Sequence, residues 1–433
     1  MSLIVVLAIV LAIGLGYVTR INIGLFAIAF SYIIGCFVMG LKPGQVIELW
    51  PLKIFFVIFS VCLFYSFAMI NGTLEKMAEH LLYRCRKVPY LLPYAIFLTA
   101  TVIAAMGAGY YTVLAFMAPL TLILCQRTGM GLILGGLAVN YGALCGANFV
   151  SSQSGIIFRG LMANAGVAED QAFVYASAIF AATLVVPIIV ISLFVLFSRK
   201  QASSGTAGDL MNMDVPSPLN GQQRTTLLLT LAMMAIVLAA PLASLALPDN
   251  ATVSFVNAKI DIGLIASVFS VIALMLKLGD EKKAIASLPW GTLIMICGMG
   301  MLISLAIKAG TIDQLSAWIS GNIPRLLVPV MFGVVAGIMS LFASTLGVVT
   351  PALFPAVPGL AASLSIDPML MFVAIVVGAQ ATSISPFSSG GSLILGSAPD
   401  EARATLFPQL LLRAAPIGFV AALLANLVLT FVL

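Results

Sequence analysis

The fold is decided by two stretches, Gly142-Ala-Leu-Cys-Gly-Ala-Asn-Phe-Val-Ser-Ser-Gln-Ser-Gly155 and Gly378-Ala-Gln-Ala-Thr-Ser-Ile-Ser-Pro-Phe-Ser-Ser-Gly-Gly391. Each lies inside a segment that otherwise reads as a membrane helix. Because glycine and proline weaken a helix, each stretch predicts a break in such a helix. A break frees carbonyl groups for a cation and N–H groups for an anion. Glycine and serine also serve close packing of membrane helices, but the match between the two stretches favours a binding site.

The composition around these stretches is that of a helical membrane protein. Of 433 residues, 62% are hydrophobic and 8% are charged, and the mean hydropathy is +1.17. Soluble domains are about 25% charged, so a soluble protein is excluded. The apolar segments are continuous rather than alternating, which excludes an outer-membrane barrel. We therefore expect an all-α polytopic membrane protein, with residues 1–19 kept as its first span rather than removed as a signal peptide.

The residues that carry enzyme or metal chemistry are scarce. There is a single histidine, His80, and none of the six cysteines forms a Cys-x-x-Cys pair. A zinc site, a disulfide framework and a membrane-embedded enzyme are therefore not expected. The net charge of +5 includes no long basic run, so nucleic acid is not an expected partner.

The chain contains an internal repeat. Residues 20–31 match residues 259–270 at seven of twelve positions, 239 residues apart. At a shift of 236 residues, Gly142, Ser152 and Gly155 correspond to Gly378, Ser388 and Gly391. Register kept over such a distance predicts a gene duplication rather than chance similarity of apolar sequence.

The repeat predicts two halves, residues 1–198 and 225–433, joined by a polar cytoplasmic linker over 199–224. Each half is expected to contain five spans and one re-entrant hairpin, and an odd number of spans inverts the second half. A charged, periodic segment at 73–86 predicts a helix on the membrane surface. The expected hairpins are about 89–126 and 326–364, and the expected broken helices are about 131–160 and 369–396.

Basic residues set the expected orientation. Under this topology thirteen lysines and arginines share one side and six share the other, so the richer side is cytoplasmic. Both termini then face the outside of a bacterial inner membrane. The first hairpin opens inward and the second outward.

Inverted repeats with broken helices are typical of secondary transporters, whose sites lie near the midplane. No aspartate or glutamate falls at the centre of a predicted span, which disfavours a proton relay or a cationic substrate. The pattern favours an anionic substrate driven by Na+, although proton coupling through the substrate's own carboxylates stays open. Arg413 is the only charge expected within a span, either pairing locally or facing the substrate path.

At these residues the sequence resembles the ion transporter superfamily, especially the MatC-type dicarboxylate (malonate) carriers and the divalent anion:sodium symporters. The resemblance rests on Ile21-Asn-Ile-Gly24, on Gly378-Ala-Gln-Ala-Thr-Ser-Ile-Ser-Pro386 and on the order of elements in both halves. It implies a homodimer with an elevator mechanism, in which hairpins and broken helices move against a scaffold. In the symporters the hairpin tips carry Ser-Asn-Thr, whereas the matching positions here read Gly109-Tyr110-Tyr111 and Thr345-Leu346-Gly347.

The candidate binding site is formed by the two hairpin tips together with the breaks in the two broken helices. No residue is expected to be catalytic, and Na+ is the only expected metal. The candidate substrate-binding residues are Gly109, Tyr110, Tyr111, Thr112, Asn148, Ser151, Ser152, Ser344, Thr345, Thr350, Ser385, Pro386, Ser388 and Ser389. The candidate cation-binding residues are Ala108, Gly109, Gly146, Ala147, Thr345, Gly347, Thr382 and Ser383.

The function expected from the sequence is secondary active transport of a small dicarboxylate such as malonate, succinate, fumarate or malate, coupled to Na+. Two alternatives stay open. The chain length also suits the large membrane subunit of a tripartite carrier that depends on a soluble binding protein. A proton-coupled carrier of carboxylates or other anions is the second alternative.

Overall fold

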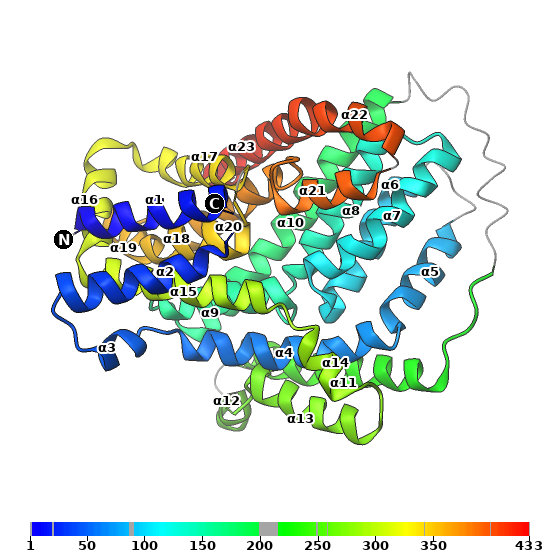
Figure 1. Cartoon of the computed structure of the whole chain (residues 1–433), viewed down its shortest axis with the longest axis horizontal. Coiled ribbons are helices and arrows are strands. Elements are labelled where there is room, and N and C mark those ends of the chain that lie inside the picture. The colour runs from blue at the N-terminus through cyan, green and yellow to red at the C-terminus, as the bar shows by residue number, and fades with distance from the viewer. Residues whose placement is uncertain are drawn as a thin grey trace.

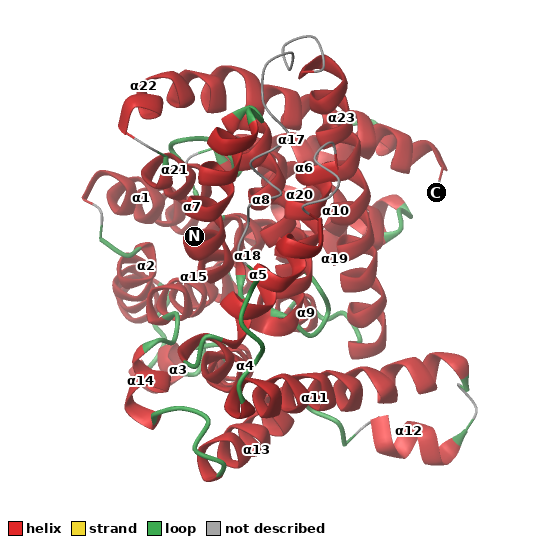
Figure 2. Ribbon diagram, turned by 90° about the vertical axis from the view of Figure 1, so that its right-hand side faces the viewer, coloured by secondary structure: helices red, strands yellow, loops and turns green. Residues whose placement is uncertain are grey.

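A computed structural model describes residues 2–19, 21–85, 91–198, 215–247, 250–257, 259–341, 343–398 and 400–432. Throughout this part the chain is helical and contains no strand (Figure 2). Six of its helices are long and apolar enough to cross a membrane, or seven if one bent pair counts as a single span. Seven further apolar helices have 10–17 residues. The prediction of an all-α polytopic membrane protein is confirmed, and the inversion of the halves stays a prediction.

The elements of the first half, blue to green in Figure 1, begin with three short or medium helices and end with one long one. They are α1 (Ser2–Thr19), α2 (Ile23–Tyr32) with its π-helical extension η1 (Ile33–Val38), α3 (Pro43–Ile47), α4 (Leu52–Ile70), α5 (Thr73–Cys85), α6 (Leu92–Ile103), the π-helical η3 (Ala104–Ala108), α7 (Tyr110–Thr128), α8 (Leu132–Ala147), α9 (Gln153–Asn164) and α10 (Glu169–Ser198).

The second half follows the same general order. It comprises α11 (Gly221–Ala246), α12 (Ala251–Asn257), α13 (Ile262–Met275), α14 (Glu281–Ala286), α15 (Trp290–Lys308), α16 (Thr311–Asn322), η5 (Arg325–Leu327), α17 (Val328–Ser340), the π-helical η6 (Thr345–Val349), α18 (Thr350–Leu353), η7 (Phe354–Ala356), α19 (Val357–Leu364), α20 (Pro368–Thr382), α21 (Ser389–Ser397), α22 (Asp400–Gln409), the π-helical η8 (Leu410–Ala414) and α23 (Ala415–Val432).

The repeated motif at residues 20–31 and 259–270 starts a helix in both halves. The Asn22 side chain accepts a hydrogen bond from the Gly24 N–H at 2.9 Å, and Asp261 Oδ1 accepts one from the Leu264 N–H at 2.8 Å. Both residues therefore act as N-caps, which satisfy an N–H group that the first turn leaves free. The motif fixes where α2 and α13 begin.

Each of these two helices, α2 and α13, packs against a helix of the other half of the chain. α2 packs on α15 of the second half, while α13 packs on α4 of the first. In the first pair a Cβ on Gly24 would lie 2.2 Å from the carbonyl oxygen of Ile294, and in the second a Cβ on Gly263 would lie 3.1 Å from Val57 Cα. Figure 1 shows α4 and α13 side by side along one edge of the molecule. Each half therefore completes its packing with a span from the other.

The hairpin arms pack on the broken helices in the same way in both halves. α6 lies along α8, and α17 lies along α20. A Cβ on Gly142 would come within 2.3 Å of the Phe97 carbonyl oxygen, and a Cβ on Gly378 within 2.2 Å of the Gly333 carbonyl oxygen. Both contacts fall at the 236-residue shift, so the repeat in the sequence is also a repeat in packing.

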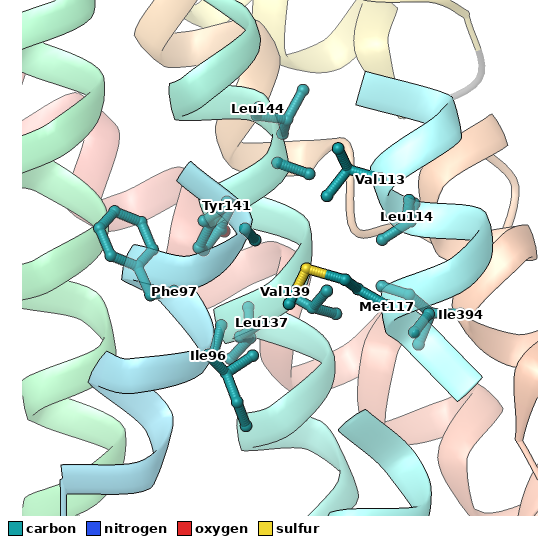
Figure 3. Packing of buried hydrophobic residues seen from close by; sticks show 14 of the residues in the cluster. Ile96, Phe97, Val113, Leu114, Met117, Leu137, Val139, Tyr141, Leu144 and Ile394 are labelled. Carbon is teal, nitrogen blue, oxygen red and sulfur yellow. The ribbon is translucent and has the colours of Figure 1, made fainter. Parts of the chain in front are cut away.

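The core of the first hairpin is apolar and closely packed. Figure 3 shows side chains from α6, α7 and α8 meeting Ile394 of α21. Phe97, Leu114 and Met117 are buried to 1% exposure or less. Close packing of this kind holds the hairpin in place through van der Waals contact between its helices.

The second arm of the second hairpin is one candidate membrane span, Thr345–Leu364, but its helix is irregular. It consists of the short elements η6, α18, η7 and α19. Pro351, Pro355 and Pro358 fall in this arm, and each removes a backbone donor and crowds the preceding turn. The last candidate span, Glu401–Phe431, runs through η8, which links α22 to α23 without a break.

Part of the predicted topology lies outside the described residues. This holds for residues 199–214 of the expected linker and for several of the basic residues used to orient the chain, namely Arg20, Arg86, Lys87, Arg199 and Lys200.

Candidate functional site

The two breaks have the same backbone arrangement. α8 ends at Ala147 and α9 begins at Gln153, while α20 ends at Thr382 and α21 begins at Ser389. The following segment folds back so closely that a Cβ on Gly155 would lie 2.2 Å from the Phe149 carbonyl oxygen. The equivalent Cβ on Gly391 would lie 2.1 Å from the Ser385 carbonyl oxygen. Glycine is required at both positions because any side chain would meet backbone.

The hairpin tips lie beside the breaks. At the first tip, Gly107 and Gly109 have φ of 94° and 73°, so the chain turns there through conformations that favour glycine. A Cβ on Gly109 would lie 2.3 Å from Gln153 Oε1, which places this tip against the start of α9. At the second tip, Ser344 Oγ accepts a hydrogen bond from the Gly347 N–H at 3.2 Å and starts η6.

A small cavity lies where these parts meet. It encloses about 350 Å³ of space, open solvent at its mouth included. The first tip, the second tip, the second break and the end of α8 all contribute to its wall. The lining residues are Tyr110, Tyr111, Leu144, Ser340, Ala343, Ser344, Thr345, Leu346, Gln380, Ser383, Ser388, Ser389 and Gly390.

The polarity of this cavity comes from backbone and neutral side chains. None of the described residues that line it carries a charge. The N-termini of α7, η6 and α21 all reach it through residues of their first turns. Helix N-termini carry partial positive charge and free N–H groups, so three of them at one cavity favour an anion.

Tyr111 connects the two tips to the second break. Its hydroxyl lies 3.4 Å from Ser344 Oγ and donates a hydrogen bond to Ser389 Oγ at 3.3 Å. The three residues lie at the boundary between the small cavity and a much wider opening, since both spaces are lined by all three. The Tyr111 ring therefore stands in the path between them.

The wider opening gives the small cavity access from one side. It includes about 2510 Å³ of space, much of it open solvent, and is mainly apolar. Its far wall comes from α1, the start of α2 and α15, through residues such as Val10, Asn22 and Met295. The wider opening therefore adjoins the small cavity at Tyr111, Ser344 and Ser389.

Behind the cavity a buried polar network joins the broken helices. Tyr110 donates to Asn140 Oδ1 at 2.7 Å, and Asn140 Nδ2 donates to Ser383 Oγ at 3.1 Å. Tyr141 donates to the Ala381 carbonyl oxygen at 2.9 Å. Because unsatisfied polar groups are costly when buried, this network fixes the end of α20 against α8.

An amide pair completes the network. Asn148 and Gln380 exchange hydrogen bonds in both directions, each at 2.9 Å. Asn148 Nδ2 also donates to Thr183 Oγ1 at 3.1 Å. Asn148 is fully buried and Gln380 is 5% exposed. The pair ties the first break to α20 and uses polar atoms of Asn148 that were predicted to face substrate.

The structure brings seven of the predicted site residues together at the small cavity, from both tips and from the second break. They are Tyr110, Tyr111, Ser344, Thr345, Ser383, Ser388 and Ser389. Pro386 lines the wider opening instead. Their role in binding stays a prediction.

Other predicted residues lie away from this cavity and bond to the protein. The Ser152 hydroxyl donates to the Ala104 carbonyl oxygen at 2.6 Å, Thr350 to that of Thr345 at 3.1 Å, and Thr382 to that of Gly337 at 2.7 Å. Ser385 Oγ accepts from the Phe387 N–H at 3.3 Å. The remaining predicted residues outside the cavity lining are Ala108, Gly109, Thr112, Gly146, Ala147, Asn148, Ser151 and Gly347.

Several residues of the site were not among those predicted. Gln380, Asn140 and Ser340 enter it through hydrogen bonds. Asparagine and glutamine inside an apolar helix are a usable signal in a sequence, because each needs a partner there. Neutral helix contacts explain them equally well, so only the coordinates reveal which partner each has.

Fold and site thus define a class, a polytopic membrane transporter with its cavity at broken helices. The sequence matches the family described as dicarboxylate carrier protein MatC N-terminus over residues 1–147 and 245–383. The match covers more than half of the chain, and the chain belongs to this family. A comparison with curated proteins gave no match.

Solved structures share the fold. The YdaH transporter of Alcanivorax borkumensis, reported to have an unusual topology, is 20% identical with a TM-score of 0.62 over 93% of this chain and 88% of its own. MtrF of Neisseria gonorrhoeae, from a class of antimetabolite efflux pumps, is 13% identical with a TM-score of 0.58 over 93% of this chain and 84% of its own.

Proposed function

We propose that the protein is a secondary active transporter that takes up a small dicarboxylate together with Na+. The observation that carries the proposal is the convergence of three helix N-termini on one uncharged cavity, in a chain of a dicarboxylate carrier family. The N–H groups of α7, η6 and α21 bind the carboxylates. Ser344 and Ser389 add hydroxyl groups, whereas the Ser388 hydroxyl already donates to the carbonyl oxygens of Ser383 and Ser385. Tyr111 separates bound substrate from the wide opening.

The residues near the first tip fit Na+. Ser151 Oγ is buried and, among the described residues, has no hydrogen-bond partner. The Gln153 side chain lies against Gly109, so neutral oxygens gather between the first tip and the first break. The described side chains that line the cavity carry no positive charge. Bound Na+ would supply the positive charge that balances the carboxylates of the substrate. Ser151, with the predicted carbonyl groups of Ala108, Gly109, Gly146 and Ala147, would hold it.

A second cation site is proposed at the second tip and break. Thr345, Gly347, Thr382 and Ser383 offer hydroxyl and carbonyl oxygens there. Their hydroxyls also take part in protein hydrogen bonds, such as that between Thr345 Oγ1 and Ser340 Oγ at 3.0 Å. A hydroxyl that donates a hydrogen bond keeps a lone pair for a cation.

We further propose that transport follows an elevator motion within a homodimer in the bacterial inner membrane. The hairpins and broken helices form one body through the buried network between α8 and α20. The exchanged pairs α2–α15 and α4–α13 form the scaffold. One family description matching a stretch of each half supports the duplication on which such a motion depends.

Uptake into liposomes tests the function. Purified protein is reconstituted alone, and accumulation of radiolabelled malonate, succinate, fumarate or malate is measured under an imposed Na+ gradient or an imposed proton gradient. Accumulation with the Na+ gradient supports the proposal. Accumulation only with the proton gradient contradicts Na+ coupling, and a requirement for added binding protein points to the tripartite carrier.

A further inference from the structure

A second cavity lies on another side of the molecule. It is enclosed by the starts of α4, α10 and α13 and by α9, and it includes about 640 Å³ of space with its open mouth. An adjoining cavity of about 570 Å³ shares Arg159, Glu169, Ile260 and Ile262 with it. Neither cavity shares a lining residue with the proposed dicarboxylate site.

Arg159 is the central group of this region. It lies on α9, two turns beyond the first break, and lines both cavities. Its Nε is buried and has no hydrogen-bond partner among the described residues. Its guanidinium carbon lies 5.5 Å from the centre of the Phe173 ring, which supports the charge from one face. The Nε donor of Arg159 is therefore buried without a protein acceptor among the described residues, a costly arrangement without a ligand.

The charges around Arg159 favour a ligand with both signs of charge. Lys53 and Glu169 form an ion pair in which both side chains are well exposed, 62% and 69%. Asp261 lines the same cavity while Oδ1 caps α13. With Lys53 and Glu169 neutralising each other, the first cavity keeps one guanidinium and one carboxylate, and Asp170 adds a second carboxylate in the adjoining cavity. A simple anion would gain from Arg159 and lose to Asp261, whereas a zwitterion interacts favourably with both.

The position of the cavity indicates a lipid. Lys53, Glu169 and Asp261 stand at the N-terminal ends of three neighbouring apolar helices, where a span meets the headgroup layer. Apolar side chains nearby are exposed, among them Phe255 at 65% and Val174 at 39%. Such residues face acyl chains in a bilayer. A ligand with a charged head and apolar tails fits a charged cavity with this rim.

We propose that this cavity binds the headgroup of a zwitterionic phospholipid of the phosphatidylethanolamine type. The phosphate accepts hydrogen bonds from Arg159, and the ammonium group donates to Asp261. The lipid then lies between α9–α10 and α4–α13, bridging the two bodies proposed to move in transport. Lipid binding does not depend on which substrate is carried, so its test is independent of uptake.

The test is lipid protection of the purified full chain in detergent. Thermal unfolding is followed while phosphatidylethanolamine, phosphatidylcholine or phosphatidylglycerol with identical acyl chains is added. Phosphatidylethanolamine is expected to raise the unfolding temperature at the lowest concentration. The other two lipids lack either N–H donors or the ammonium group.

Variants assign the effect to the cavity. Arg159→Gln is expected to weaken the protection by roughly tenfold in lipid concentration, because the charged hydrogen bonds to the phosphate are lost. Arg159→Lys keeps the charge and is expected to weaken it less. Asp261→Asn keeps an N-cap but removes the charge, so it is expected to abolish the preference for phosphatidylethanolamine over phosphatidylcholine. Lys42→Gln, at an exposed lysine outside the cavity, is the matched control and is expected to change nothing.

Three results would overturn the proposal. One is equal protection of the natural protein by all three lipids, and another is an unchanged lipid response in Arg159→Gln. The third is full protection by free phosphoethanolamine, which would make the ligand a soluble zwitterion rather than a lipid. If Arg159→Gln fails to fold, Arg159→Lys and Asp261→Asn still decide between these outcomes.

Discussion

At the scale of single residues, the proposed Na+ site calls for oxygens that the protein itself leaves free. Ser151 and Ser152 are neighbours in the first break, yet their hydroxyls differ. Ser152 Oγ donates to the Ala104 carbonyl oxygen, whereas Ser151 Oγ is buried without a partner among the described residues. A buried hydroxyl without a partner is rare, so Ser151 is the sharper candidate for a Na+ ligand.

Ser151→Ala is therefore expected to raise the Na+ concentration for half-maximal uptake by about tenfold, because one ligand oxygen is lost while no protein hydrogen bond is broken. The measurement is initial uptake into liposomes at varied Na+ and saturating substrate. Ser304→Ala is the control, since Ser304 Oγ donates to the Gly300 carbonyl oxygen of its own helix. Equal Na+ dependence in both variants would remove Ser151 from the cation site.

A second residue-scale prediction concerns close packing at Gly378. A Cβ there would lie 2.2 Å from the Gly333 carbonyl oxygen, so Gly378→Ala must push α17 and α20 apart. We expect destabilisation of about 1–3 kcal/mol, measured as a lower unfolding temperature in detergent. Gly396→Ala is the matched control, because a Cβ at Gly396 has no heavy atom within 4 Å. An equal effect of the two substitutions would contradict the packing argument.

At the scale of elements, two broken helices are held together by one reciprocal amide pair. Asn148 belongs to the first break and Gln380 to α20, and their hydrogen bonds cross between the halves. The sequence marks both residues as polar groups in an apolar region. It does not show that they pair with each other, because their partners are 232 residues away in the chain.

Asn148→Ala and Gln380→Ala are each expected to lower stability and uptake together, since each leaves a buried amide without its partner. The double variant is expected to lose less than the sum, with a coupling of about 0.5–3 kcal/mol. Unfolding temperatures and uptake of all four proteins give the cycle. Additive losses would contradict pairing, and loss of uptake by Asn148→Ala with unchanged stability would restore Asn148 as a substrate ligand.

At the scale of the whole molecule, the described lining of the proposed substrate site contains no acidic, basic or histidine side chain. Among the described residues, its lining is tyrosine, serine, threonine, glutamine and apolar side chains. Charge on the substrate is therefore the only charge at the site that changes between about pH 4 and pH 9. The pH dependence of uptake then belongs to the ligand.

Uptake at saturating Na+ is expected to fall on acidification in step with the second carboxyl ionisation of the acid supplied. Comparing malonate with fumarate checks this, because the second carboxyl group of fumaric acid ionises at a clearly lower pH than that of malonic acid. The pH at which uptake of each substrate is half-maximal should match the pH at which the second carboxyl group of that acid ionises. A common midpoint for both substrates would mean that a protein group titrates instead.

Much of the fold could be predicted from the sequence. Apolar periodicity and the internal match located the breaks at 142–155 and 378–391 because glycine, serine and proline are conspicuous inside apolar segments. The site was predicted less well. Asn148, Ser152 and Thr382 were read as ligands, whereas the structure shows their side chains hydrogen-bonded within the protein. Hydrogen-bond partners are set by packing between distant helices, which spacing along the chain does not reveal.

The exchange of α2 and α13 between the halves has a consequence for how the protein is made. When the first half leaves the ribosome, α2 has no α15 and α4 has no α13, because those helices have not been synthesised. Two apolar spans must wait in the lipid, or with an insertion factor, until translation passes Lys308. A nascent chain stalled before that point lacks the helix against which α2 packs in the complete fold.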